Sequence, residues 1–360
     1  MSSFLTSHGY LAAFLSFFVC AALLPLVRKA ACHFQAHDRP GPLKIHTAPI
    51  PRLGGVAMML ATVAGFAVSS YGSPLNFIHF YFALGLIWYV GFIDDLMSLP
   101  AAIRLLAQFG AGFLLSQTRW NLTLFNHPIL DSILTSLFVV VFVNAFNFLD
   151  GSDGIAGGVA ALVALGYGAL YGTPTTGAGG ALAWSLLGAC LAFLAYNFPP
   201  ARIFMGDSGS TMTGFLIAFL SLDFYRVHHH IGTHWLLPLV FAGLPLMDFT
   251  LAVIRRLRNR VSPFSGDRGH FYDIFLDRGW SSVNVALAAY AVTGVLLVVG
   301  WFCIHPDWKI SVLLLFIVAF LFAISLRNFD AIRERSQLIF GTDPENARQP
   351  GTPSNANSRE

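Results

Sequence analysis

Long apolar stretches, separated by short polar or Gly/Pro-containing segments, make up most of the chain. Eleven of them approach the roughly 20 apolar residues that a helix needs to cross a membrane. They run over 9–27, 54–71, 76–93, 102–118, 132–149, 155–171, 180–197, 211–225, 235–254, 283–303 and 310–326. They lack the period-2 alternation of membrane barrels, and an open sheet cannot sit in lipid. The pattern therefore predicts an all-α, polytopic integral membrane protein with about eleven transmembrane helices.

The ninth stretch contains both Pro238 and Pro245. A proline inside a helix removes a backbone hydrogen bond and clashes with the preceding turn. We therefore expect this helix to be kinked or broken.

The distribution of positive charge predicts how the helices are oriented. If the N-terminus lies outside, eighteen of the 21 Lys and Arg residues fall on the inner side, and only Arg119, Arg226 and Lys309 fall outside. Cytoplasmic loops of membrane proteins carry such an excess. We therefore expect the N-terminus outside and the C-terminus in the cytoplasm. Residues 1–340 would form a single transmembrane domain, and 341–360, rich in Pro, Asn, Gly and Ser, a disordered cytoplasmic tail.

Composition narrows the class of protein further. Hydrophobic residues make up 56% of the 360 and charged residues only 11%, against about 25% charged in a typical soluble domain. These values exclude a disordered chain, a nucleic-acid binder and an ordinary soluble enzyme. The four cysteines are scattered and form no CxxC pair, so we expect neither a disulfide nor a thiolate metal site.

Ten of the 18 acidic residues lie at or near the predicted cytoplasmic ends of helices. A charged side chain at the centre of a membrane helix costs roughly 2.5–3.5 kcal/mol on the insertion scale, so such residues are usually paired or hydrated. Their gathering on one side of the membrane predicts a single acidic, water-accessible site that faces the cytosol.

Two of the acidic groups offer ligands for a cation. Asp94 and Asp95 are adjacent carboxylates that repel each other, so a cation is a natural partner. Asn144, Asn147 and Asp150 are spaced by three and share one helical face. Their side chains supply the oxygen ligands that Mg²⁺ uses. Solvation at the helix end, interhelical hydrogen bonding and helix capping are the alternative interpretations.

Two further segments suit a phosphate group. Asp207 and Ser208 open a predicted helix, and small residues there let a phosphate approach its free N–H groups. Beyond the arginine-rich segment 255–260, the motif Asp267-Arg268-x-His270 offers Arg and His side chains, which can donate hydrogen bonds to phosphate oxygens. A simple N-cap, and for the arginines membrane topology and anionic lipid headgroups, are the alternatives. Taken together, these groups predict a Mg²⁺-assisted reaction of phosphates in which one substrate is a lipid.

The motifs resemble those of a known family, the polyprenyl-phosphate N-acetylhexosamine-1-phosphate transferases. The resemblance covers about residues 38–280 and rests on five motifs in order. They are Lys44-x-His46-x-x-Pro49 with Arg52-Leu53-Gly54-Gly55, Gly91-Phe92-Ile93-Asp94-Asp95, Asn144-Ala-Phe-Asn147-Phe-Leu-Asp150-Gly-x-Asp153-Gly-x-Ala-Gly-Gly158, Phe204-Met205-Gly206-Asp207-Ser208-Gly209-Ser210, and Ser262-Pro263-Phe264-Ser265-x-Asp267-Arg268-x-His270.

The resemblance implies a reaction and a place for it. Undecaprenyl phosphate would attack the sugar-linked phosphorus of a UDP-N-acetylhexosamine, UMP would leave, and the lipid-linked diphosphosugar would initiate a cell-envelope glycan such as the O-antigen of lipopolysaccharide. The transmembrane domain would then be catalytic, in the bacterial cytoplasmic membrane, with its active site on the cytoplasmic face. Its partners would be the two substrates and the lipid bilayer, and both a monomer and a homodimer remain open.

The same resemblance implies Mg²⁺ as the cofactor and a role for each matching residue. The metal ligands would be Asp207 and Asn147, and Asp94 and Asp95 would line the metal and lipid-phosphate site. The residues that would bind substrate are Lys44, Asp150, Asp153, Asn197, Phe204 and Arg268, with the ring of Phe204 stacked on uracil. His270 would act in catalysis on the diphosphate.

One departure from the family pattern bears on the sugar. The phospho-MurNAc-pentapeptide translocase branch has a run of three histidines where this chain has His270-Phe271-Tyr272-Asp273. We therefore expect a GlcNAc-like or deoxy-HexNAc donor instead. A secondary transporter with an acidic cytoplasmic-side ion site is the alternative, since acidic residues and broken helices occur there too. A membrane phosphatase is a third interpretation.

Overall fold

The computed structural model describes residues 8–41, 44, 46–69, 77–171, 178–228, 236–263 and 266–303. All of them belong to one compact unit, residues 1–311. The last predicted span, 310–326, and the predicted tail, 341–360, lie outside the described residues.

Helices make up most of this part of the chain, as the hydrophobic pattern predicts. Their bounds are α2 (His8–His33), α3 (Gly54–Ser69), α4 (Ile78–Met97), α5 (Ala101–Ser116), α6 (Pro128–Leu149), α7 (Ile155–Leu170), α8 (Ala178–Asn197), α9 (Gly206–His228), α10 (Leu237–Phe241), α11 (Gly243–Arg258), α12 (Phe271–Asp277) and α13 (Ser282–Cys303). The first ten predicted spans each fall on one of these helices, except the ninth, which falls on two.

Five of the described helices, namely α2, α4, α6, α8 and α13, have the length and apolar composition to cross a membrane. The apolar helices α3, α5 and α7 are shorter. Helix α9 contacts α3, α4, α6, α7 and α8, and every residue from Ser208 to Tyr225 is buried. Helix α9 is therefore the central helix of the described bundle.

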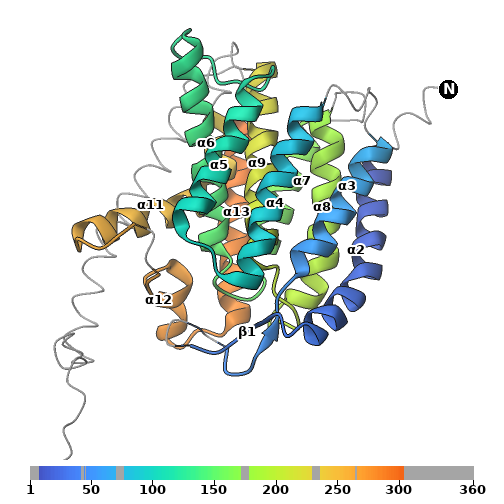
Figure 1. Cartoon of the computed structure of the whole chain (residues 1–360), viewed down its shortest axis with the longest axis vertical. Coiled ribbons are helices and arrows are strands. Elements are labelled where there is room, and N and C mark those ends of the chain that lie inside the picture. Colours follow the sequence, from blue (N-terminus) through green and yellow to red (C-terminus); the bar gives the residue numbers. More distant parts are fainter. Residues whose placement is uncertain are drawn as a thin grey trace, which may run out of the picture. The chain divides into compact units, whose positions relative to one another are not determined.

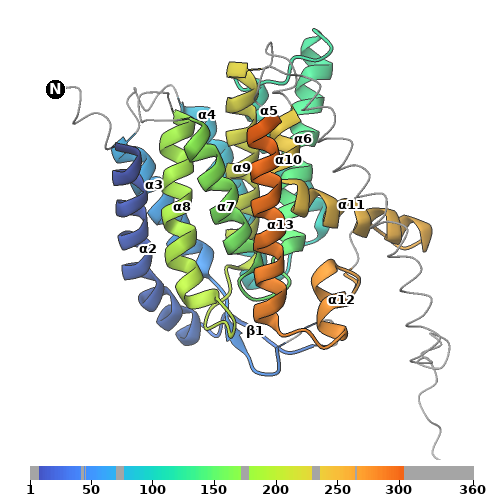
Figure 2. The ribbon, with the colours of Figure 1, turned by 180° about the vertical axis from the view of Figure 1, so that it is seen from behind.

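The connections that matter for function lie at one end of the bundle. In Figure 1 the long helices run side by side, and the segments that join α2 to α3, α4 to α5, α6 to α7 and α8 to α9 lie at the same end as the short strand β1 (His37–Asp38) and α12. The view from behind in Figure 2 shows the same arrangement. The acidic clusters of the sequence are therefore gathered at one end, as predicted.

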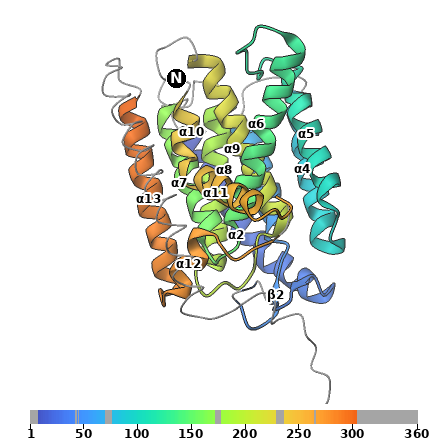
Figure 3. The same ribbon diagram turned by 90° about the vertical axis from the view of Figure 1, so that its left-hand side faces the viewer.

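The ninth predicted span is broken, and it is not a single spanning helix. Helix α10 ends at Phe241 and α11 begins at Gly243, with Pro238 in the first turn of α10 and Pro245 in the first turn of α11. Figures 1 and 3 show α11 lying crosswise to the bundle helices, with its end pointing away from them. The prolines predict the break, while the change of direction follows from packing that the local sequence does not reveal.

Three small elements, two strands and a short helix, were not predicted from the hydrophobic pattern. Strands β1 (His37–Asp38) and β2 (Ile50–Pro51) pair antiparallel, with His37 opposite Pro51. The short helix α12 follows the Asp-Arg-x-His motif. Two-residue strands and a seven-residue helix are too short to leave a periodic signal, so the all-α prediction missed the two-stranded sheet.

Candidate active site

The carboxylate of Asp95 holds the first turn of α9. Its two oxygens accept hydrogen bonds from the backbone N–H of Asp207 (2.8 Å), the backbone N–H of Ser208 (3.1 Å) and the Ser208 hydroxyl (2.7 Å). The first N–H groups of a helix have no partner within the helix, so a carboxylate placed there acts as a cap. Two amides that the sequence suggested for a phosphate are thus engaged by Asp95.

Two glycines explain how α4 and α9 come so close. A Cβ atom on Gly91 would lie 2.7 Å from the carbonyl oxygen of Asp207, closer than real Cβ atoms come to another atom. Gly206 has a φ of +71°, which L-residues rarely adopt, and a Cβ there would lie 2.5 Å from the Asp95 carboxylate. The glycines of the two motifs therefore serve the contact between them.

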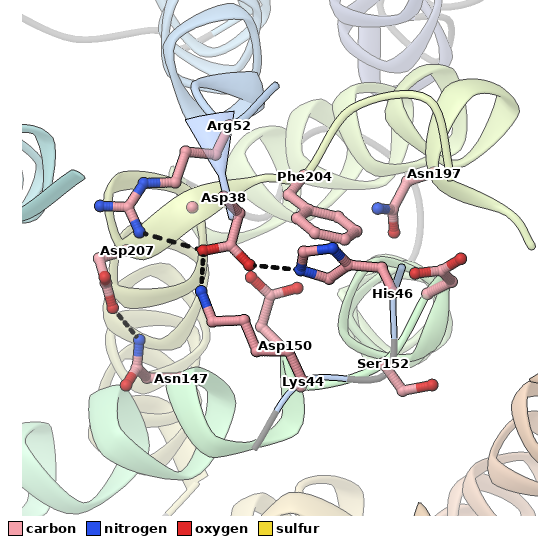
Figure 4. Close-up of a pocket in the computed structure, with 13 residues that line it drawn as sticks. Asp38, Lys44, His46, Arg52, Asn147, Asp150, Ser152, Asn197, Phe204 and Asp207 are labelled. Atoms are coloured by element: carbon pink, nitrogen blue, oxygen red, sulfur yellow. Dashed lines mark hydrogen bonds and ion pairs between the residues drawn. The ribbon is translucent and has the colours of Figure 1, made fainter. Parts of the chain in front are cut away.

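Asn147 and Asp207, the predicted metal ligands, meet at the end of α6 and the start of α9. The Asn147 amide donates hydrogen bonds to Asp207 Oδ1 (2.7 Å) and to the Ser210 hydroxyl (2.9 Å). Figure 4 shows the pair at one side of the cavity. The structure therefore brings together two residues that are 60 positions apart in the sequence.

Arg104 joins Asp94 to the same pair, and sequence reasoning missed it. Its Nη1 lies 2.9 Å from Asp94 Oδ2 and 4.0 Å from Asp207 Oδ1. Asp94 also accepts a hydrogen bond from the backbone N–H of Leu99. Arg104 lies in the first turn of α5, where the helix dipole disfavours a cation. That unfavourable position was the signal that could have marked it as a site residue.

The loop before α3 contributes further basic side chains, which surround the carboxylate of Asp38. Its carboxylate binds the ammonium group of Lys44, accepts a 2.7 Å hydrogen bond from His46 Nε2, and lies 3.7 Å from Arg52. The His46 ring packs against Phe204, with centroids 5.3 Å apart (Figure 4). Of these residues only Lys44 and Phe204 were assigned to the site from the sequence.

Arg52 also connects this loop to the end of α4. Its guanidinium donates to the carbonyl oxygen of Asp95 (2.6 and 3.0 Å) and to that of Asp94 (3.2 Å). Carbonyls at the end of a helix have no partner within the helix and carry its negative dipole end. Arg52 therefore holds the two carboxylate-bearing residues in place through their backbone.

One open cavity collects most of the predicted residues. Its lining residues are Asp38, Lys44, His46, Arg52, Asn147, Asp150, Gly151, Ser152, Asp153, Asn197, Phe204, Gly206 and Asp207. Asp94, Asp95, Arg268 and His270 were predicted in the site but do not line it. Asp94 and Asp95 lie just behind the wall, with Asp95 in contact with Asp207.

Asn197 and Asp153 fasten the loops around the cavity to each other. Asn197 accepts a hydrogen bond from the backbone N–H of Gly154 (2.9 Å) and donates to the carbonyl of Ile203 (3.0 Å). Asp153 accepts a hydrogen bond from the backbone N–H of Ala201 (2.9 Å). Much of the polar capacity of these two side chains is therefore used by the protein's own backbone.

Among the carboxylates that line the cavity, Asp150 is the one whose charge the protein does least to stabilise. Within the described part of the chain no hydrogen bond or ion pair of its side chain is present. Its partial burial, together with the nearby charges of Asp207, Asp95, Asp153 and Asp38, raises the pKa of Asp150 well above its ordinary value. A cation or a cationic group of a ligand at this wall would relieve that repulsion.

The Asp-Arg-x-His segment forms a separate group beside the end of α6. His270 is buried, and its Nδ1 lies 2.6 Å from Asp248 Oδ2. Arg268 pairs with Asp277 (2.8 Å) rather than with any cavity residue. His270 and Arg268 therefore stay predictions as diphosphate-contacting residues, and the structure places both outside the cavity lining.

Two arginines of α11 anchor this segment. Asp267 is bound by Arg255 Nε (2.6 Å) and Arg256 Nη2 (2.7 Å). Although burial opposes it, hydrogen bonds from these two arginines and their charges hold the pKa of Asp267 below its ordinary value. Two of the four arginines that the sequence left to topology and lipid headgroups thus bind a carboxylate of their own chain.

The donor set at Asp207 and Asn147 fits Mg²⁺. Across the described ranges, no group of three or more His, Cys, Asp and Glu side chains is placed to hold a metal ion. Mg²⁺ does not need such a cage, because it commonly keeps waters and binds one or two carboxylates plus substrate phosphates. One carboxylate and one amide at the wall of a cavity lined by further carboxylates match that preference.

Comparison with known proteins decides the family. A family model described as glycosyl transferase family 4 matches residues 77–225, which run from the start of α4 to the last turns of α9. A probable undecaprenyl-phosphate N-acetylglucosaminyl 1-phosphate transferase of Bacillus subtilis (strain 168) is 31% identical over 284 residues, covering 75% of this chain and 78% of that protein. The chain belongs to glycosyl transferase family 4.

Other relatives support the same membership. A decaprenyl-phosphate N-acetylglucosaminephosphotransferase of Mycobacterium tuberculosis (strain ATCC 25618 / H37Rv) is 30% identical over 330 residues, covering 80% of this chain and 79% of that protein. An undecaprenyl-phosphate alpha-N-acetylglucosaminyl 1-phosphate transferase of Escherichia coli (strain K12) is 27% identical over 333 residues, covering 84% and 87%. With its apolar helices, this glycosyl transferase family 4 member is a multi-pass membrane protein. The resemblance inferred from the motifs is confirmed.

Proposed function

We propose that this protein transfers N-acetylhexosamine-1-phosphate from a UDP-sugar to undecaprenyl phosphate. The observation that carries the proposal is the Asp207–Asn147 pair in a cavity that also holds Lys44, Arg52 and an aromatic ring, Phe204. The names of the relatives favour N-acetylglucosamine as the sugar and a polyprenyl phosphate as the acceptor.

The proposed reaction is one phosphoryl transfer. An oxygen of the lipid phosphate forms a bond to the sugar-linked phosphorus of the UDP-sugar. The bond between that phosphorus and the oxygen bridging it to UMP breaks, and UMP leaves with the bridging oxygen. A phosphate monoester has its second pKa near ~6, so the lipid phosphate is mostly ionised at neutral pH and needs little help from a base.

The chain's own groups supply binding, charge and position. Lys44 and Arg52 offer cationic donors to phosphate oxygens, and the Phe204 ring offers a face to uracil. Arg104, between Asp94 and Asp207, can meet negative charge that develops on the transferred phosphoryl group. Asp207 and Asn147 would hold Mg²⁺, which when bound would neutralise charge on the diphosphate.

The proposed place is the bacterial cytoplasmic membrane, with the cavity open to the cytoplasm, where nucleotide-sugars are made. The excess of Lys and Arg on the same side as the cavity loops supports that orientation. The lipid-linked diphosphosugar would then begin a cell-envelope glycan.

The test is incubation of the purified protein with undecaprenyl phosphate, Mg²⁺ and a panel of UDP-N-acetylhexosamines. We expect UMP and lipid-linked sugar in equal amounts, with UDP-GlcNAc among the active donors. Free phosphate without a need for UDP-sugar would indicate a phosphatase. Uptake of solute into proteoliposomes, with no UMP from any donor, would indicate a transporter.

A further inference from the structure

Two tyrosine hydroxyls contact the backbone at the turn between α6 and α7, residues 150–154. Tyr272 of α12 donates a hydrogen bond to the carbonyl oxygen of Phe148 (3.2 Å). Tyr290 of α13 donates one to the carbonyl oxygen of Gly154 (2.7 Å). The two hydrogen bonds lie on either side of Asp150, whose carboxylate lines the cavity.

Both tyrosines also fill space that side chains on this segment would need. A Cβ atom on Gly151 would overlap the hydroxyl of Tyr272, and a Cβ atom on Gly158 would overlap the ring of Tyr290. Gly151 lines the cavity and Tyr272 does not. Tyr272 therefore lies directly behind the cavity wall.

Tyr272 is itself firmly placed. It is buried, and its ring lies parallel to that of His270, with an interplanar angle of 5° and centroids 5.3 Å apart. His270 is in turn bound to Asp248 of α11 (2.6 Å). The group that contains the Asp-Arg-x-His motif thus supports the turn through Tyr272.

We propose that Tyr272 and Tyr290 are positioning residues that set the α6–α7 turn, and with it the affinity of the cavity for the donor nucleotide-sugar, without touching that substrate. The inference rests on the proposed function. The carbonyl of Phe148 is among the last four of α6, which have no partner within the helix. Without the hydroxyl this turn loosens, and Asp150 loses its fixed place in the wall.

The effect belongs to binding and not to the chemical step. Asp207 is held by Asp95 and Asn147, and neither contact involves a tyrosine. A tyrosine-to-phenylalanine change removes one hydroxyl and leaves the ring packing in place. A lost neutral hydrogen bond is worth about a fivefold change in an equilibrium constant.

The test compares Tyr272→Phe and Tyr290→Phe with a matched control, Tyr167→Phe. Tyr167 is buried and its hydroxyl bonds to the Ser221 hydroxyl (2.8 Å), away from the cavity lining. We expect KM for the UDP-sugar to rise about fivefold in each of the two variants, kcat to stay within about twofold, and the control to change neither. Backbone amides of 148–154 should exchange hydrogen faster in the two variants than in the control.

Three results would overturn the proposal: an unchanged KM, a fall in kcat alone, or the same changes in Tyr167→Phe. If KM is unchanged while exchange is faster, the hydroxyls stabilise the fold only. Hydrogen exchange needs no turnover and uses no substrate. A wild-type protein that releases UMP from no donor would refute the proposed function, while the exchange data would still decide whether the tyrosines hold the turn.

Discussion

The carboxylate of Asp95 lies under the first turn of α9 and accepts a 2.8 Å hydrogen bond from the backbone N–H of Asp207. One aspartate of the adjacent pair thus fixes the position of the proposed metal ligand, while the other, Asp94, binds Arg104. The two neighbouring carboxylates, which look equivalent in the sequence, have different surroundings and should respond differently to substitution.

Replacing Asp95 by Asn should lower stability. The buried carboxylate accepts three hydrogen bonds, and an amide would turn an N–H₂ group toward N–H donors. We expect a loss of about 1–3 kcal/mol in the free energy of unfolding. Thermal unfolding in detergent would measure it, with Asp277→Asn as the control, since that carboxylate is 60% exposed in a surface ion pair. Equal melting temperatures for the two variants would show that Asp95 is not a structural cap.

Asp207→Asn should keep the fold and lose transfer. The contact with Asp95 uses the backbone N–H of Asp207, which the substitution does not change. Of the two proposed Mg²⁺ ligands, Asp207 and Asn147, only Asp207 is charged, and the substitution removes that charge. UMP release should therefore fall by orders of magnitude, at least about a hundredfold.

Asn147→Ala should raise the Mg²⁺ concentration needed for half-maximal activity before it abolishes turnover. Titration of Mg²⁺ against UMP release would check both, and a normal rate for Asp207→Asn would remove it from the site.

Arg104→Gln should reduce turnover more than Arg104→Lys. The substitution leaves Asp94 buried without its cation and removes positive charge from the neighbourhood of Asp207. We expect UMP release to fall at least about tenfold for Gln, with partial activity for Lys, which keeps the charge but not the planar fork. Initial rates at saturating Mg²⁺ would show this. If both variants release UMP at the wild-type rate, Arg104 has no role in the reaction through Asp94 or Asp207.

Asp150→Asn should stabilise the protein in the absence of metal and nucleotide at alkaline pH. The pKa of Asp150 is raised in the folded state above the ordinary value of about 3.9, so ionising this carboxylate opposes folding. The opposition is fully present above the folded-state pKa, shrinks as the pH falls through it, and disappears below the ordinary pKa. Melting temperatures at pH 8 and pH 5 would test the sign. A variant less stable than the wild type at pH 8 would show that the carboxylates do not repel each other in this way.

The sequence predicts the helices well because each is long, apolar and bounded by polar or Gly/Pro residues. It also predicts that Asp207 and Asn147 belong together, because motif resemblance carries information about contacts between distant segments. It does not reveal that Asp95 points into α9 while Asp94 points to Arg104, since adjacent helical residues face different directions and only packing selects the partners.

The first loop and the α11–α12 group show where sequence reasoning ends. Asp38, His46 and Arg52 line the cavity because β1 and β2 bring them back to Phe204. Two-residue strands leave no pattern to predict that return. Conversely, the side chains of Arg268 and His270 are of types that bind phosphate, yet in this structure they are paired with Asp277 and Asp248. Residue type indicates what a side chain can bind, and only the fold decides what it meets.

A radioactive label in the sugar-linked phosphate tests the proposed transfer itself. Purified protein would be incubated with undecaprenyl phosphate, Mg²⁺ and UDP-GlcNAc that carries ³²P in the sugar-linked phosphate. The proposed reaction moves that phosphate with the sugar, so the label should appear in the lipid and none in the released nucleotide, which should be UMP. Label recovered in UDP, with unlabelled sugar on the lipid, would refute the proposed reaction, because the protein would then transfer the sugar without its phosphate.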